Sequence, residues 1–252
     1  MKKILALGTL FLLAFTVFSQ SKKILIIATN RDSVGANKSG TYLMEIAYPF
    51  KYFTDKGIEV DILTPKGGQT SLYDNGKISE DLERIKNDEF FIKKAATSLS
   101  PNDVKVGDYM AVFYPGGHGQ YFDVMNDERI AKITADIYEN GGILGTAGHG
   151  VASLINVRLG NQKFLVDGKT ITCFPAWAEK LYMNISEFGK LLPFDMQEVL
   201  ARRGADLKVC TYENRSDKQY THVIDPKNRI VTGAFASSAQ WVAEEVFKQL
   251  KF

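Results

Sequence analysis

The stretch ILGTAGHGVASL, residues 143–154, passes from strand-forming residues into a helical segment through three small or polar residues. Residues 143–147 have the length and apolar character of a buried strand, and we expect residues 151–156 to form a helix. A strand that turns sharply into a helix places the side chain at its apex in a site, while backbone N–H groups of the helix start face a developing oxyanion. The apex residue here is Gly148.

On both sides of this turn, apolar runs of strand length alternate with segments of helical period. The expected strands are residues 23–28, 58–63, 109–114, 143–147, 169–174, 207–211 and 221–224. The expected helices, besides 151–156, are residues 42–54, 80–95, 128–139, 197–203 and 238–248. This alternation is typical of βαβ units, and it predicts an α/β fold with a mainly parallel sheet.

The chain is expected to form one domain, residues 20–252. Its size and apolar fraction suffice for one sizeable core. The charged segment 66–107 follows the turn sequence TPKGG at residues 64–68 and interrupts the alternation. We therefore expect it to be a small cap insertion over one edge of the sheet.

Residues 1–19 have the features of a signal peptide. Lys2 and Lys3 precede an almost wholly apolar run, residues 4–18, and Ser19 completes a small-residue cleavage pattern. The run is shorter than the roughly 20 residues of a membrane span, so an uncleaved anchor is the weaker alternative. The sequence predicts an exported protein, periplasmic or secreted, without membrane attachment after cleavage.

The charge pattern argues against a nucleic-acid partner. The formal net charge of +2 falls to 0 when Lys2 and Lys3 are removed, and no compact Lys/Arg run remains in the mature chain. Only Cys173 and Cys210 are present. In an oxidising compartment they either form one disulfide or remain two separately buried thiols, and sequence alone leaves both open.

A second turn rich in glycine and histidine follows another expected strand, at residues 115–119 (PGGHG). Ligand sites in open α/β sheets lie outside the carboxyl ends of the strands, so His118 and His149 are expected to meet there. Nearby aromatic residues form either pocket walls or core: Tyr121, Phe122 and Trp177. The spacing of the histidines and acids matches no standard zinc signature, and no metal or other cofactor is predicted.

Several motifs together resemble the ThiJ/PfpI superfamily, within the class I glutamine amidotransferase-like fold. Residues 145–154 resemble its nucleophile elbow. Three further motifs resemble the branch that contains heat-shock chaperones and glyoxalase III: GTYLME at 40–45 with Pro49, YPGGHG at 114–119 and FPAWAE at 174–179. The resemblance covers essentially the whole mature chain. It implies a flavodoxin-like sheet with helices on both faces, and a homodimer.

The resemblance also implies roles for individual residues. His149 corresponds to the catalytic histidine, Glu179 to the carboxylate that orients it, and Glu45 to the acid that holds the proton of the nucleophile. Gly117 and His118 correspond to the oxyanion and ligand-binding loop. Glu45 stands on an otherwise apolar helix face, which indicates a buried carboxyl with a perturbed pKa rather than a solvent-facing one.

The nucleophile itself is missing, because Gly148 stands where the family's cysteine would be. Without a thiolate at the apex, hemithioacetal formation or acyl transfer at that position is excluded. Glycine also suits the strained backbone of an elbow. His222 has no partner visible in the sequence and is read as a strand residue.

Three hypotheses of function follow. The first is an exported pseudoenzyme that binds a small carbonyl compound or a peptide. The second is a cysteine-independent enzyme resembling glyoxalase III, with His149 and Glu45 as its acid–base groups. The third is a chaperone-like holdase, which requires an exposed apolar patch.

Overall fold

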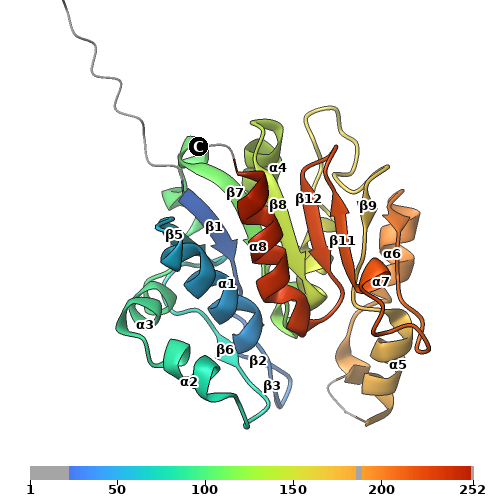
Figure 1. The fold of residues 1–252 in the computed structure, drawn as a ribbon, viewed down its shortest axis with the longest axis horizontal. Coiled ribbons are helices and arrows are strands. Elements are labelled where there is room, and N and C mark those ends of the chain that lie inside the picture. Colours follow the sequence, from blue (N-terminus) through green and yellow to red (C-terminus); the bar gives the residue numbers. More distant parts are fainter. Residues whose placement is uncertain (1–22, 186–188, 251–252) are drawn as a thin grey trace, which may run out of the picture.

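The computed structural model describes residues 23–185 and 189–250. The expected signal peptide, residues 1–19, lies outside the described residues. A six-stranded sheet has the order β11-β12-β8-β7-β1-β5 and forms the centre of the molecule (Figure 1). Its strands are β1 (Lys23–Ile27), β5 (Val60–Leu63), β7 (Tyr109–Tyr114), β8 (Ile143–Ala147), β11 (His222–Asp225) and β12 (Ile230–Gly233). All neighbours pair in parallel except β11 and β12, so the α/β prediction is confirmed.

Helices cover both faces of the sheet, because its central strands are apolar on both sides. Helices α1 (Leu43–Asp55) and α8 (Ala239–Gln249) cover one face, and α4 (Glu128–Glu139) covers the other (Figure 1). Alternate residues of β1 supply the two cores: Ile24 and Ile26 pack with α1 and α8, while Leu25 and Ile27 pack with α4. This is the flavodoxin-like arrangement that the sequence predicted.

The register of the central strands brings the turns that follow β1, β7 and β8 to one edge of the sheet. Ile26 of β1 lies opposite Phe113 of β7, and Tyr114 of β7 lies opposite Thr146 of β8. The carboxyl ends of these strands therefore lie side by side. The turns that follow β7 and β8 contain the two predicted histidine motifs.

Shorter elements surround this frame. The short strands pair as β2 (Ser33–Val34) with β3 (Asn37–Lys38), β4 (Thr41–Tyr42) with β6 (Leu72–Tyr73), and β9 (Thr170–Ile171) with β10 (Asp206–Leu207). The other α-helices are α2 (Glu80–Lys86), α3 (Glu89–Ala96), α5 (Ala176–Ile185), α6 (Met196–Arg202) and α7 (Lys218–Thr221). The 3-10 helices are η1 (Pro101–Asp103), η2 (Val106–Asp108), η3 (His118–Tyr121), η4 (Gly148–Leu154), η5 (Gly189–Leu191) and η6 (Ala236–Ser238).

Two predicted helices differ in the structure. The helix expected over residues 80–95 is two helices, because the side chain of Asp88 accepts a hydrogen bond from the N–H of Phe91 and starts α3 anew. The helix expected over residues 151–156 is the 3-10 helix η4, which begins at the apex Gly148 itself.

The last third of the chain was predicted less well. The expected strand at 169–174 is reduced to the two-residue strand β9, and the one expected at 207–211 overlaps the two-residue strand β10 only at Leu207. Strands β9 and β10 form a sheet of their own. Strand β12 and helix α5 were not predicted as elements. Strand β12 is four residues long and fully buried, so it has no alternating pattern to reveal it.

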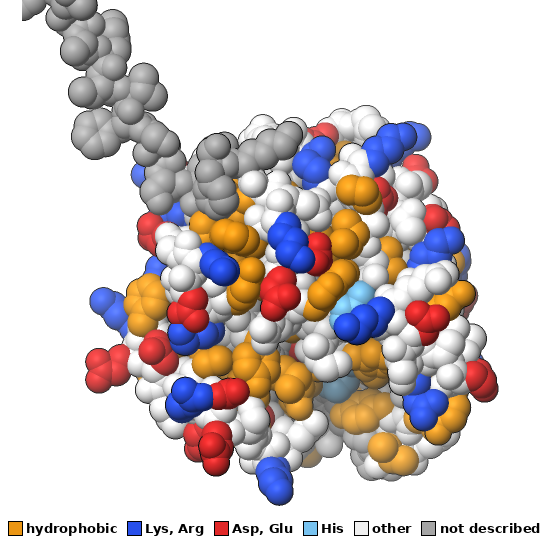
Figure 2. Space-filling view, in the orientation of Figure 1, with side chains coloured by type: hydrophobic (Ala, Val, Ile, Leu, Met, Phe, Trp, Pro, Cys, Tyr) orange, Lys and Arg blue, Asp and Glu red, His pale blue; other side chains and the backbone are white. Residues whose placement is uncertain are grey.

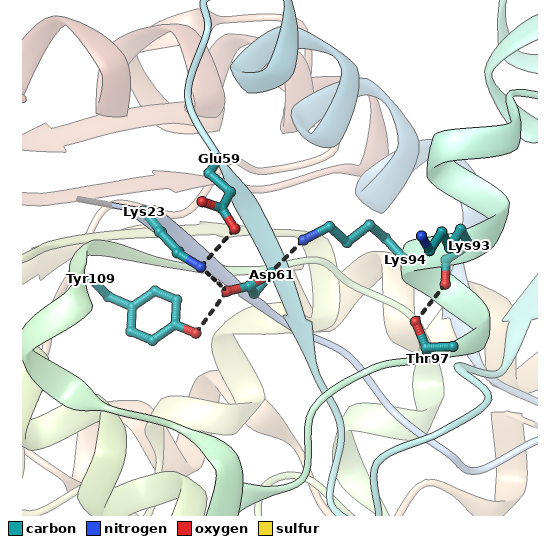
Figure 3. A network of polar contacts seen from close by, with 7 residues as sticks. All are labelled: Lys23, Glu59, Asp61, Lys93, Lys94, Thr97 and Tyr109. Atoms are coloured by element: carbon teal, nitrogen blue, oxygen red, sulfur yellow. Dashed lines mark hydrogen bonds and ion pairs between the residues drawn. The ribbon is translucent and has the colours of Figure 1, made fainter. Parts of the chain in front are cut away.

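The insertion at residues 66–107 packs onto helix α1 and the β5 edge, and several of its apolar residues join the core beneath α1. A polar network anchors it at the opposite end of the sheet from the histidine turns (Figure 3). Asp61 of β5 accepts from Lys94 of α3 at 2.7 Å, from Tyr109 at 3.0 Å and from Lys23 at 3.3 Å. Burial alone would raise the pKa of Asp61, but these donors together hold it below its ordinary value.

The helices of the described residues are short compared with a membrane-spanning helix. Within residues 23–185 and 189–250 the longest helix, α1, has 13 residues. No helix in this part of the chain has both the length and the apolar character needed to cross a bilayer.

Candidate functional site

The turn from β8 into η4 places Gly148 at the floor of a pocket. Its φ of +50° lies in the left-handed region, where a side chain is strained. A Cβ built at this position would lie 2.4 Å from Oε1 of Glu45. The carboxyl group of Glu45 therefore fills the space in which a side chain at position 148 would begin.

Glu45 is buried at the first turn of α1, with 3 % of its surface exposed. Burial raises the pKa of its carboxyl to about 7, although His149 and a hydrogen bond from the backbone of Gly116 act in the opposite direction. Oε1 of Glu45 has no hydrogen-bond partner among the described residues. The prediction of a buried carboxyl with a perturbed pKa is confirmed, and a carboxyl that is half ionised near pH 7 is suited to proton transfer.

His149 and Glu179 form a buried pair, although they lie in different elements. Nε2 of His149 is 2.9 Å from Oε2 of Glu179, and the imidazole ring stacks on Phe174 with ring centroids 4.4 Å apart. A carboxylate can only accept, so Nε2 donates to Glu179. Nδ1 of the neutral ring then keeps its lone pair and can act as a base.

His118, at the start of η3, lies against His149 with ring centroids 4.6 Å apart. The two histidine turns therefore meet, as the sequence predicted. The ring of His118 also stacks on Tyr182, with ring centroids 5.0 Å apart, and Nδ1 of His118 is 3.4 Å from the hydroxyl of Tyr73. Burial, and then the neighbouring His149, lower the pKa of His118 to about 2, so this side chain is neutral at any physiological pH.

Gly117 makes the turn before η3 rather than lining the pocket. Its φ is +110°, and a Cβ there would lie 2.4 Å from the carbonyl oxygen of Gly40. Only glycine permits this approach of two backbone segments. The predicted oxyanion role of Gly117 stays a prediction.

The pocket has a volume of about 460 Å³ and combines a polar floor with aromatic walls. Figure 2 shows a hollow at the lower edge of the face, between the segments that carry α2 and α5, with histidine inside it. The floor is formed by Glu45, His118, Gly148 and His149, and the aromatic walls by Tyr42, Tyr73, Phe174, Tyr182 and Phe235. A larger groove of about 560 Å³ lies along α4, but none of the predicted site residues lines it.

The aromatic walls were largely missed from the sequence. Tyr121, Phe122 and Trp177 are not among the residues that line the pocket, and Tyr121 is part of the core. Tyr73 comes from the insertion and Tyr182 from the unpredicted helix α5. Their contribution depends on packing between distant segments, and no local pattern marks it.

The remaining cysteines and the third histidine lie outside the site. Cys173 and Cys210 are both free and buried, so the separate-thiol alternative holds. Burial raises the pKa of both thiols, which keeps them protonated and unreactive. His222 begins β11, and its ring contacts Trp241 with centroids 4.5 Å apart.

Comparisons with known proteins identify the family of this chain. The sequence profile of the DJ-1/PfpI family matches residues 36–190, more than half of the chain. The chain belongs to the DJ-1/PfpI family. Among its relatives in this family, the glutathione-independent glyoxalase HSP31 of Saccharomyces cerevisiae is 33% identical over 242 residues, covering 91% of this chain and 98% of the yeast protein.

Solved structures of similar proteins cover almost the whole chain. The rapid encystment protein of 24 kDa from Francisella tularensis superposes with a TM-score of 0.79 at 26% identity, covering 92% of this chain and all of that one. Glyoxalase III from Candida albicans gives a TM-score of 0.76 at 27% identity, covering 92% and 98%. The predicted superfamily and its glyoxalase III branch are both confirmed.

Proposed function

We propose that this protein binds small dicarbonyl compounds of the glyoxal type in the pocket around Gly148, without forming a covalent adduct. The observation that carries the proposal is the arrangement at the floor. The family resemblance implies that Glu45 is the acid, His149 the catalytic histidine and Glu179 its orienting carboxylate, and these side chains lie close together at or beside the pocket floor. Gly148 supplies no nucleophile beside them.

Neither remaining cysteine compensates for this loss. Cys173 is fully buried in the core and Cys210 is 2 % exposed, and burial raises the pKa of each thiol. A protonated thiol that no substrate can reach is not a nucleophile. The pocket thus favours non-covalent recognition of a polar carbonyl group between aromatic walls.

Binding is tested by saturation transfer from the protein to the methyl protons of methylglyoxal in NMR. We expect transfer with the parent protein and none with Ser237→Trp, which places a large side chain at an exposed position in the pocket lining. Gln240→Trp, at an exposed position of α8 outside this lining, is the matched control and keeps the signal. Equal transfer with both tryptophan variants would show that the ligand binds elsewhere.

A second candidate is a cysteine-independent isomerase, and the position of Glu45 favours it. Methylglyoxal hydrate and lactic acid are isomers, so the conversion needs no oxidant. The carboxylate of Glu45 would remove the hydrogen from the hydrated carbon, and the resulting enediol would take a proton back at the neighbouring carbon. A carboxyl with a pKa of about 7 can serve in both steps.

Lactate formation separates the two candidates. Alkylation does not reach the buried thiols, so the assay uses the double variant Cys173→Ala/Cys210→Ala. The binding proposal predicts no lactate above the protein-free rate. Lactate production by this variant that is lost on Glu45→Gln would establish the isomerase instead.

We also propose that the protein is exported and that residues 1–19 are removed. The basic Lys2 and Lys3, the apolar run at 4–18 and Ser19 support this. N-terminal sequencing of the protein from the periplasm or medium of an expressing bacterium is expected to begin at Gln20. Leu10→Arg, which interrupts the apolar run, is expected to retain the protein in the cytosol. Full-length parent protein found there would contradict the proposal.

A further inference from the structure

Three side chains of the kinds that bind metal ions converge at the pocket floor. His118 of η3, His149 of η4 and Glu179 of α5 each offer one ligand atom, and these atoms lie within 4.8 Å of one another. All three side chains are buried, each with 8 % of its surface exposed. They come from three separate elements, so only the folded chain brings them together.

The separations are close to those of a coordination sphere. Metal bonds of about 2.0–2.1 Å place neighbouring ligand atoms roughly 2.9–3.4 Å apart. The 2.9 Å between Nε2 of His149 and Oε2 of Glu179 is a hydrogen bond in this structure, and metal binding at Nε2 would release the proton that Nε2 donates. The ligand atom of His118 lies within 4.8 Å of the other two, so it needs to approach by up to roughly 1.9 Å to reach this spacing.

The donor set also suits a cation. Oε1 of Glu179 is buried and has no hydrogen-bond partner among the described residues. An unpaired buried carboxylate oxygen is costly, and a metal ion would offset that cost.

A fourth coordination position would be open. Gly148 has no side chain, and the pocket of about 460 Å³ lies against His118, Gly148 and His149. Three protein ligands with a free position facing a cavity are typical of zinc sites that keep a water molecule. Two imidazoles and one carboxylate are ligands that zinc, cobalt and nickel ions accept.

We propose that His118, His149 and Glu179 form a binding site for a divalent metal ion of the zinc class, with its free position facing the pocket at Gly148. The sequence predicted no metal site, because the ligands are far apart along the chain and match no zinc signature. The proposal stands apart from carbonyl binding, which needs only the pocket.

The test is a titration of tag-free, chelator-treated protein with Co²⁺, followed by visible absorption, and with Zn²⁺, followed by calorimetry. One ion per chain is expected. His118→Ala and Glu179→Gln are each expected to weaken binding by at least about 100-fold, more than the roughly 10–100-fold lost with outer-shell partners. Glu179→Gln keeps the shape and the contact with His149, so it separates loss of a ligand from loss of folding.

His222→Ala is the matched control, because this histidine lies at β11 against Trp241, away from the site. It is expected to bind both ions as the parent does. The absence of saturable binding would overturn the proposal, as would equal affinities of His118→Ala and His222→Ala. Parent-like binding by Glu179→Gln would overturn the three-ligand assignment.

Discussion

Replacing Glu45 by Gln raises the free energy of unfolding by about 3 kcal/mol at pH 8 and changes it by less than about 1 kcal/mol at pH 4. The folded protein holds the pKa of Glu45 at about 7, against an ordinary value of 4.5. Between these two values the folded state keeps a proton that the unfolded chain has released. Stability therefore falls as the pH rises through this window, and the loss is complete above pH 7. A neutral glutamine avoids it.

Urea unfolding of both proteins from pH 4 to pH 8, with a chelator present, measures this difference. Glu83→Gln on the exposed face of α2 is the control, and it is expected to show no comparable dependence on pH. A difference between Glu45→Gln and the parent that is the same at pH 4 and pH 8 would contradict a raised pKa. The expected result means that the protein sacrifices stability to keep an acid at the pocket floor.

Gly148→Cys is expected to convert methylglyoxal to lactate at least about 100-fold faster than is measured with the parent, which is expected to show only the protein-free rate. A factor of about 100 is the lower end of what a positioned catalytic group contributes. The elbow aims the new thiol into the pocket, with Glu45 placed to take its proton and the His149–Glu179 pair beside it. The substitution strains the backbone, at φ +50°, by about 1–3 kcal/mol. It also displaces the Glu45 carboxyl, which is the end of a flexible side chain.

Gly148→Ala is the matched control, because it adds the same Cβ and the same strain but no thiol. It is expected to be destabilised like the cysteine variant and to produce no lactate. Mass spectrometry after brief iodoacetamide treatment reports whether the new thiol is reactive, since Cys173 and Cys210 are buried. A folded cysteine variant that reacts with iodoacetamide yet produces no lactate would show that the catalytic frame has decayed.

The residues nearest the elbow were the easiest to predict. Helix α4 and strand β8 have the predicted bounds, because each is a periodic segment with a clear end signal. The bounds of helices and strands were predicted less well where tertiary contacts or single side-chain hydrogen bonds, rather than a periodic pattern of apolar residues, decide them. Strand β12 is short and fully buried, so its residues show no alternating pattern. Helix α3 begins at Glu89 because the side chain of Asp88 caps it with one hydrogen bond.

The residues of the candidate site likewise fall into those that were predicted from motifs and those that only the fold brings to the pocket. Gly148, His149, Glu45 and Glu179 were named from motifs, and all four lie together at or beside the pocket floor. The walls from Tyr73 and Tyr182 were not foreseen, because an insertion and an unpredicted helix supply them. No metal site was predicted from the sequence, because the spacing of His118, His149 and Glu179 along the chain matches no zinc signature. Spacing along the chain says little about distances in the folded protein, where their ligand atoms converge.

The sequence by itself determined the main alternation of strands and helices as far as the elbow, the glycine at the elbow and the absence of a nucleophile there. These properties are local, since they depend on period, turn chemistry and the identity of one residue. Only the tertiary structure decided that Glu45 is buried with a raised pKa, that His149 pairs with Glu179 and that His118 joins them. Burial and electrostatic interactions act across space, so they are set by segments that the fold brings together from distant parts of the chain.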